Sequence, residues 1–142
     1  MSETNCDIKT NNDGPDWIYS ENVKDHFLSP RNFLMGDESL FSCDTTGIVG
    51  NPICGDQMKM YLQIKDNKIV DVRWKTYGCA SAIASTSALS ELVKGKTLEA
   101  ALEIGPTEIT EFLGGLPKHK FHCSVLGHEA LAAAIENYRK LA

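Results

Sequence analysis

Two neighbouring stretches of the chain, residues 57–65 and 69–78, alternate between apolar and polar side chains. Successive side chains of a strand point to opposite sides of a sheet, so this alternation predicts two strands, each with one buried and one wet face. The buried face is expected to carry Met58, Met60, Leu62, Ile64, Val70, Val72 and Trp74. The wet face is expected to carry Gln57, Lys59, Tyr61, Gln63, Asp71, Arg73 and Lys75. The sequence DNK between them predicts a turn, and a shorter strand near residues 47–49 would complete a small sheet.

A helix is predicted before the strands. Ser20 can cap its start, and Val23, His26 and Phe27 follow at helical spacing. Pro30 would end it, because the residue before a proline avoids helical backbone angles. Residues 33–47 are expected to form a loop.

Four further helices are predicted after the strands, starting at Cys79, Thr97, Pro106 and near Ser124. Gly95 and Gly114 would stop the first and the third of them. The last runs to the C-terminus with Leu131, Ile135 and Tyr138 on one face. Strands grouped before helices predict an α+β fold, with helices on one side of a small antiparallel sheet.

Length and charge narrow the class of protein. The 142 residues suit one domain, expected over residues 18–142 after a polar, disordered or loosely ordered tail of residues 1–17. A net charge of −5 argues against a nucleic-acid binder, which would usually have a basic face. No apolar run approaches the ~20 residues of a membrane span, and the N-terminus lacks an apolar signal core. We therefore expect a cytoplasmic protein that binds neither membranes nor nucleic acids.

The five cysteines do not suggest a disulfide framework, because their number is odd and no signal peptide precedes them. Cys6 is expected to be an exposed thiol of the tail, and Cys43 a structural residue. Cys54, Cys79 and Cys123 each fall at a junction between elements, and the last two fall near helix starts, where the helix dipole favours a thiolate. Each cysteine alone would be most simply a small core residue.

The neighbours of these three cysteines favour metal chemistry. Asp56 and His122 lie one or two residues away, and three thiolates with one nitrogen or oxygen ligand suit zinc, copper(I) or an iron–sulfur cluster. A Cys123 nucleophile with His122 as its base is the competing interpretation. Adjacent residues of a helix do not face each other, which favours two ligands converging on a metal over a nucleophile and its base. A hydrolase lacks support, because no third catalytic residue or oxyanion motif is evident.

Five segments together resemble the NifU/IscU family of iron–sulfur cluster scaffold proteins: YSENVKDHFLSPRN, GIVGNPICGD, YGCASAIASTSALSELVKGKT, LPKHKFHCS and LGHEALAAAIENYRK. The resemblance runs in order from about Trp17 to the C-terminus. It implies a three-stranded antiparallel sheet packed against about five or six helices. It also implies a non-enzymatic scaffold that accepts sulfur as a persulfide, binds iron, assembles a 2Fe-2S cluster and transfers it.

The resemblance also implies the site and the partners. Cys54, Cys79 and Cys123 would be cluster ligands with Asp56 or His122 as the fourth, and Cys123 would be the persulfide acceptor; zinc can occupy the same site. Lys120 and Tyr19 match accessory positions of the family. Implied partners are a PLP-dependent cysteine desulfurase and apo-proteins that receive the cluster. A ferredoxin, a frataxin-like protein, an Hsp70-type chaperone and a second copy of the chain are further candidates.

One stretch of this sequence departs from the family pattern. The chaperone-binding stretch, usually LPPVK, is LPKHK at residues 116–120, which puts chaperone recognition in doubt. The alternative to a cluster scaffold is a zinc-bearing sulfur acceptor that stimulates the desulfurase. Members of that subgroup usually lack the histidine before the last cysteine and carry an insertion there, whereas His122 is present here without an insertion.

Overall fold

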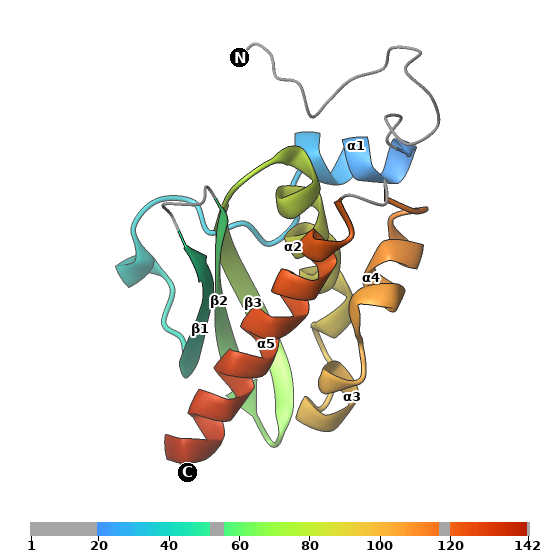
Figure 1. Cartoon of the computed structure of the whole chain (residues 1–142). Helices are drawn as coiled ribbons and strands as arrows, with labels where there is room; N and C mark the ends of the chain where they lie inside the picture. The colour runs from blue at the N-terminus through green and yellow to red at the C-terminus, as the bar shows by residue number, and fades with distance from the viewer. Residues whose placement is uncertain (1–19, 52–55, 117–119, 142) are drawn as a thin grey trace.

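The computed structural model describes residues 20–51, 56–116 and 120–141 (Figure 1). Three antiparallel strands form one sheet in the order β1-β2-β3: β1 (Thr45–Asn51), β2 (Asp56–Lys65) and β3 (Lys68–Tyr77). The helices are α1 (Glu21–Leu28), α2 (Ala80–Val93), α3 (Leu98–Leu102), α4 (Pro106–Phe112) and α5 (His122–Leu141), with a short 3₁₀ turn η2 (Glu38–Leu40). α5 packs on β1 and β2, and α2 packs on β3 and against α5. The predicted α+β fold with a three-stranded sheet and five or six helices is confirmed. The expected tail lies outside the described residues.

Local sequence signals account for most element boundaries. The Ser20 hydroxyl accepts the Val23 N–H at the start of α1, and Thr97 does the same for Ala100 at the start of α3. Asp66 and Asn67 both have positive φ angles, as a tight hairpin turn requires. Two segments differ from expectation. The loop predicted over residues 33–47 contains η2 and the start of β1, and α5 begins two residues before Ser124.

The buried face of β3 departs from strict alternation. Val70, predicted to point inward, is 48% exposed, and Ile69 is buried instead. The cause is a register shift: Ile64 pairs with Ile69, but the preceding Gln63 pairs with Asp71, so Val70 is an extra residue in β3. Beyond such a bulge, each side chain points to the side of the sheet opposite to the one that strict alternation predicts.

The outer face of β2 is less wet than predicted. Tyr61, expected on the wet face, is 1% exposed. The segment that carries η2 lies beside this face, since the Lys59 ammonium contacts the Glu38 carboxylate at 2.8 Å and lies over the Tyr61 ring at 5.1 Å. The alternation placed Tyr61 on the correct side of the strand, but it could not show that a loop covers that side.

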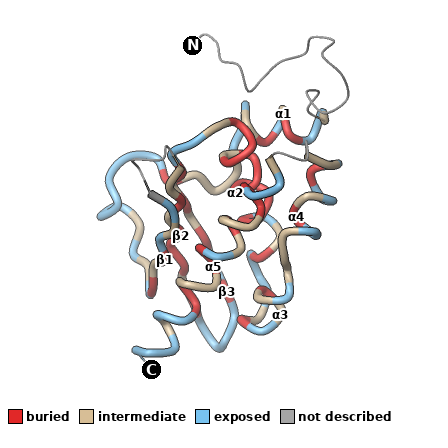
Figure 2. Tube along the Cα trace, in the orientation of Figure 1, coloured by how far each residue is buried: buried red, intermediate tan, exposed pale blue. Residues whose placement is uncertain are grey.

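α2 is the most deeply buried helix (Figure 2). Its buried residues are small: Ala80, Ser81, Ala82, Ala84, Ser85, Thr86, Ser87, Ala88 and Ser90, together with Leu89 and Val93. Small side chains allow the sheet, α1 and α5 to approach the helix closely. The Thr86 hydroxyl donates to the Ala82 carbonyl at 2.8 Å and lies 3.0 Å from the Thr76 hydroxyl of β3. Cys79, directly before this helix, is therefore held on a rigid element.

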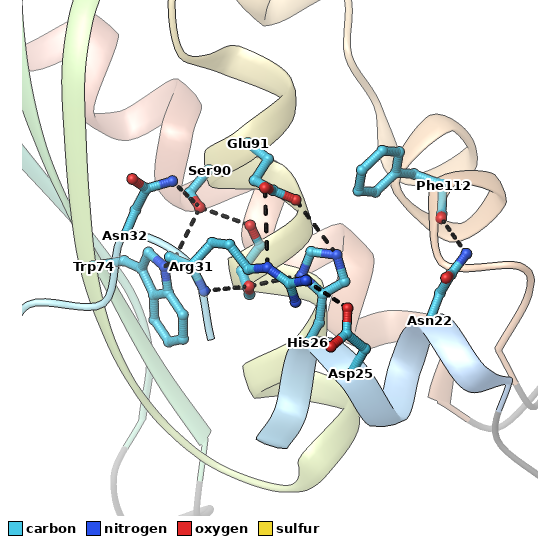
Figure 3. A network of polar contacts seen from close by, with 10 residues as sticks. Asn22, Asp25, His26, Arg31, Asn32, Trp74, Ser90, Glu91 and Phe112 are labelled. Carbon is cyan, nitrogen blue, oxygen red and sulfur yellow. Dashed lines mark hydrogen bonds and ion pairs between the residues drawn. The ribbon is translucent and has the colours of Figure 1, made fainter. Parts of the chain in front are cut away.

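A network of polar contacts joins α1 to α2 (Figure 3). His26, 5% exposed, contacts the Ser87 hydroxyl through Nδ1 at 2.7 Å and the Glu91 carboxylate through Nε2 at 3.5 Å. The Ser87 oxygen also accepts the Arg31 backbone N–H at 2.9 Å. His26 is thus packed and hydrogen-bonded between α1 and α2. Burial, followed by the nearby Arg31 cation, lowers the pKa of His26 below its ordinary value.

Stability is therefore expected to fall as the pH is lowered below about 6.5. The unfolded chain binds a proton at His26 more readily than the folded chain, so acid favours unfolding; above this pH the contribution is fully present. Urea denaturation between pH 7.5 and 5 would measure the slope. His26→Gln should flatten it, whereas His128→Gln is the control, because the His128 ring is half-buried beside the Ile104 carbonyl, away from the network of His26. Equal slopes of stability against pH for His26→Gln and the native chain would contradict the assignment of this acid sensitivity to His26.

Candidate functional site

Three elements begin at one end of the sheet and bring four predicted ligands together (Figure 1). Asp56 is the first residue of β2, Cys79 directly precedes α2, and His122 and Cys123 are the first two residues of α5. Cys54 lies outside the described residues, as does Tyr19. The described part of the site thus contains two thiols, one imidazole and one carboxylate.

The contacts run from one side chain to the next. The Cys79 and Cys123 sulfurs are 3.9 Å apart, the Cys123 sulfur is 3.8 Å from His122 Nε2, and His122 Nε2 is 4.0 Å from Asp56 Oδ2. The thiols are too far apart for a disulfide, whose S–S bond is about 2.05 Å. Within residues 20–51, 56–116 and 120–141, no three His, Cys, Asp or Glu side chains are arranged to hold a metal ion.

The spacing of the two sulfurs nevertheless fits shared metal ligation. Two thiolates bound at about 2.3 Å to one tetrahedral ion lie about 3.8 Å apart. The donors also match soft, thiophilic metals, because two sulfurs and one imidazole are present beside a single carboxylate. Iron or zinc thus suits the donor set that the fold brings together.

His122 and Cys123 both lie in the first turn of α5, and His122 Nε2 is 3.8 Å from the Cys123 sulfur. The two side chains were expected to converge on a metal rather than to act as a nucleophile and its base. The 3.8 Å contact is a weak hydrogen bond to sulfur, but the Cys79 sulfur and the Asp56 carboxylate lie against the same pair, at 3.9 Å and 4.0 Å. The geometry therefore favours neighbouring ligands over a nucleophile and its base.

The thiol of Cys123 is fully buried and is not held as a thiolate. A hydrogen bond with Cys79, followed by burial, raises its pKa above the ordinary value of a cysteine. The Lys120 ammonium opposes this rise and the Asp56 carboxylate adds to it. The helix dipole at the start of α5 was expected to lower the pKa of Cys123, and the hydrogen bond and the burial outweigh that effect. A metal ion would reverse the balance, since coordination removes the thiol proton.

Hydroxyl contacts fix the start of α5. Ser124, fully buried, lies 3.0 Å from the Thr110 hydroxyl of α4, and its N–H donates to the Phe121 carbonyl. The sequence argument missed Thr110, because only the fold brings α4 beside this turn. The sequence argument also missed Gly78. The signal that could have found this glycine is its position directly before Cys79.

A surface hollow of about 390 Å³ lies near the other end of α2, lined by Arg31, Asn32, Glu91 and Lys94. Its two cations already face carboxylates: Arg31 contacts Asp25 and Lys94 contacts Asp71 at 3.3 Å. None of the described thiols, Cys43, Cys79 and Cys123, lines this hollow. No helix in the described part of the chain is both long and apolar enough to cross a membrane.

Comparison with known proteins agrees with this geometry. The model of the NifU-like N terminal domain matches residues 18–142. The chain belongs to the NifU/IscU family. A relative named iron-sulfur cluster assembly scaffold protein IscU, from Escherichia coli K12, is 49% identical over 125 residues, covering 85% of this chain and 94% of its own. IscU 1 of Archaeoglobus fulgidus is also 49% identical, over 121 residues, covering 85% of this chain and 76% of its own.

The family includes longer proteins. The nitrogen fixation protein NifU of Nostoc sp. is 46% identical over 127 residues, which are 87% of this chain but 42% of that protein. Among solved structures, an N-terminal NifU-like protein from Brucella abortus shares the fold at 16% identity, with a TM-score of 0.69 over 87% of this chain and 95% of its own. A candidate SUF-system scaffold from Fervidobacterium islandicum AW-1 has a TM-score of 0.65 at 25% identity, covering 86% of this chain and 99% of its own.

Proposed function

We propose that this NifU/IscU family member is a scaffold on which an iron–sulfur cluster is assembled and from which it is transferred. The observation that carries the proposal is the convergence of Asp56, Cys79, His122 and Cys123 at the starts of three elements. The names of the IscU relatives support it. The scaffold catalyses no turnover of its own, and its cluster is cargo.

The cluster would be of the 2Fe-2S type, held by Cys54, Cys79 and Cys123 with Asp56 or His122 as the exchangeable fourth ligand. Three thiolates and a carboxylate around a +2 core give a net charge of −2, whereas neutral imidazole in place of the carboxylate gives −1. A fourth ligand other than cysteine would leave the cluster easier to release. Zinc can occupy the same donors when no cluster is present.

Sulfur would reach Cys123 as a persulfide from a PLP-dependent cysteine desulfurase. The Cys123 thiolate attacks the terminal sulfur of the donor persulfide, a new S–S bond forms on Cys123, and the donor cysteine leaves as a thiolate. Because Cys123 is fully buried in this conformation, the side chains that cover it would have to move for the sulfur to be received. Lys120, whose cation lowers the pKa of Cys123, would favour the attacking thiolate.

Assembly also needs electrons. Reducing two persulfide sulfurs to sulfide takes four electrons; two ferrous ions supply two of them as they become ferric, and a ferredoxin-type reductant would supply the other two. Apo-proteins that need a cluster are the acceptors. A frataxin-like protein, an Hsp70-type chaperone and a second copy of this chain stay as further candidate partners, in the cytoplasm. Tyr19, an accessory residue in this proposal, lies outside the described residues, as do residues 117–119 of the altered chaperone stretch.

Anaerobic reconstitution tests the proposed function. The full chain would be incubated with iron, cysteine, a cysteine desulfurase and a reductant, followed by optical and Mössbauer spectra. A 2Fe-2S spectrum and transfer of the cluster to an apo-ferredoxin are expected. A chain that accepts sulfur and binds zinc but forms no transferable cluster would instead establish the zinc-bearing sulfur acceptor, which the 3.9 Å spacing of the sulfurs also fits.

Asp56→Ala is expected to retain or stabilise the bound cluster and to slow its transfer about tenfold. Removing the carboxylate leaves His122 as the fourth donor and lowers the negative charge that favours release. The rate of cluster transfer to apo-ferredoxin measures this effect. Asp44→Ala is a control away from the site, because the Asp44 carboxylate accepts the Ile64 N–H at 2.7 Å. An unchanged transfer rate for Asp56→Ala would show that Asp56 takes no part in cluster release.

A further inference from the structure

Gly78 lies between the end of β3 and Cys79, and its lack of a side chain leaves space for another residue's carboxylate. A Cβ at this position would lie 2.7 Å from Asp56 Oδ1 and 3.7 Å from Asp56 Cγ. The φ angle of Gly78 lies outside the left-handed region, so the backbone alone would accept other residues here. The glycine is therefore needed for space.

The register of the sheet explains why these two residues meet. β2 and β3 pair antiparallel with Gln57 opposite Tyr77, so the next residues outward, Asp56 and Gly78, lie side by side just beyond the last pair. Cross-strand neighbours of this kind have Cβ atoms about 5 Å apart, within reach of a short side chain. With no Cβ opposite, the Asp56 carboxylate can fold across Gly78 toward the start of α2.

The other carboxylate oxygen faces the remaining donors. Asp56 Oδ2 lies 4.0 Å from His122 Nε2, which is itself 3.8 Å from the Cys123 sulfur. The carboxylate thus lies between the Gly78 backbone and the imidazole. A methyl group at position 78 would push it out of this space, whereas the imidazole, held from α5, would keep its place.

We infer that Gly78 is a positioning residue that seats the Asp56 carboxylate beside the His122 imidazole, and that a larger residue there would leave His122 as the only non-thiol ligand. The inference rests on the proposed function, because it concerns the fourth ligand of that site. It assigns to Gly78 an influence on which ligand is used, although Gly78 does not itself bind the metal. The size of residue 78 selects between an oxygen and a nitrogen donor.

A double-mutant cycle with Co²⁺ as the probe tests this role in the full chain. Native protein, Gly78→Ala, Asp56→Ala and the double variant would be titrated with Co²⁺, and the thiolate charge-transfer and ligand-field bands recorded. Gly78→Ala alone should weaken Co²⁺ binding about tenfold and give the spectrum of Asp56→Ala. In the Asp56→Ala background it should change neither affinity nor spectrum, because no carboxylate is left to displace. Equal losses in both backgrounds would overturn the inference.

A control separates the carboxylate from the other neighbour of position 78. The added Cβ would also lie 3.1 Å from the Ala82 Cβ of α2. Adding Ala82→Gly to Gly78→Ala should therefore restore little of the Co²⁺ affinity. Full restoration would assign the effect to crowding against α2 and would overturn the inference.

Stability without metal gives a second readout that does not depend on the proposed function. The added methyl group has to displace the Asp56 carboxylate only where that carboxylate is present, so Gly78→Ala should change the urea midpoint of the metal-free chain less favourably in the native background than in the Asp56→Ala background. Equal changes in the two backgrounds would overturn the inference that Gly78 makes room for the Asp56 carboxylate. A native chain that gives no thiolate charge transfer with Co²⁺ would count against the proposed ligand set, and the metal-free cycle would still decide the role of Gly78.

Discussion

Gly47→Ala is expected to lower the free energy of unfolding by about 3 kcal/mol or more, the upper end of what overpacking costs. A Cβ on Gly47 of β1 would collide with the backbone of α5, at the Ala130 carbonyl and the Ala134 amide, and would lie 2.9 Å from the Ala134 Cα. These atoms belong to a regular helix and cannot move singly. The helix would have to move off the sheet.

Two hydrogen bonds would be strained by the same movement. The Thr45 hydroxyl donates to the Ala134 carbonyl at 2.7 Å, and the Asn137 amide donates to the Thr46 carbonyl at 2.9 Å. Each contributes about 1 kcal/mol when intact. Urea denaturation followed by circular dichroism measures the loss.

Gly127→Ala is the matched control, because it makes the same substitution at the buried face of α5. Its Cβ would meet the Leu89 Cδ2 at 3.5 Å, an ordinary van der Waals contact. Alanine also favours a helix interior over glycine by about 1 kcal/mol, so this variant should be slightly more stable than the native chain. A Gly47→Ala variant as stable as Gly127→Ala would mean that β1 and α5 are not in such close contact.

Cys123→Ser is expected to abolish persulfide loading, the largest functional effect in this set. A hydroxyl cannot accept a sulfane sulfur, and the replacement of sulfur by oxygen changes little else in a buried site of this size. Mass spectrometry after incubation with a desulfurase and cysteine would show the gain of one sulfur in the native chain and none in the variant.

Cys43→Ser is the control for this experiment. Cys43 is half-buried before β1 and lies outside the group of side chains formed by Asp56, Cys79, His122 and Cys123. Its replacement should leave loading unchanged. Loading that survives in Cys123→Ser and is lost in Cys79→Ser would transfer the acceptor role to Cys79, whose sulfur lies 3.9 Å away.

Local patterns were sufficient to predict the strands, the helix caps and the turn, because those features depend on neighbouring residues. They failed where distant segments intervene. Val70 faces outward because of a bulge that only the pairing with β2 defines, and Tyr61 is buried because a loop covers its face. The meeting of Cys79, Cys123, His122 and Asp56 is likewise a product of the fold. Chemistry and family resemblance indicated these residues, but their distances could not be read from spacing.

The small side chains of α2 have a consequence for how the protein can change through evolution. A helix enclosed on nearly all sides has little room for any larger residue, so most single substitutions along it would be rejected. Cys79 stands directly before this tightly packed helix, whereas the side chains of Asp56 and His122 are 31% and 54% exposed. Substitutions at Asp56 or His122 would therefore disturb the packing of the fold less than substitutions along α2.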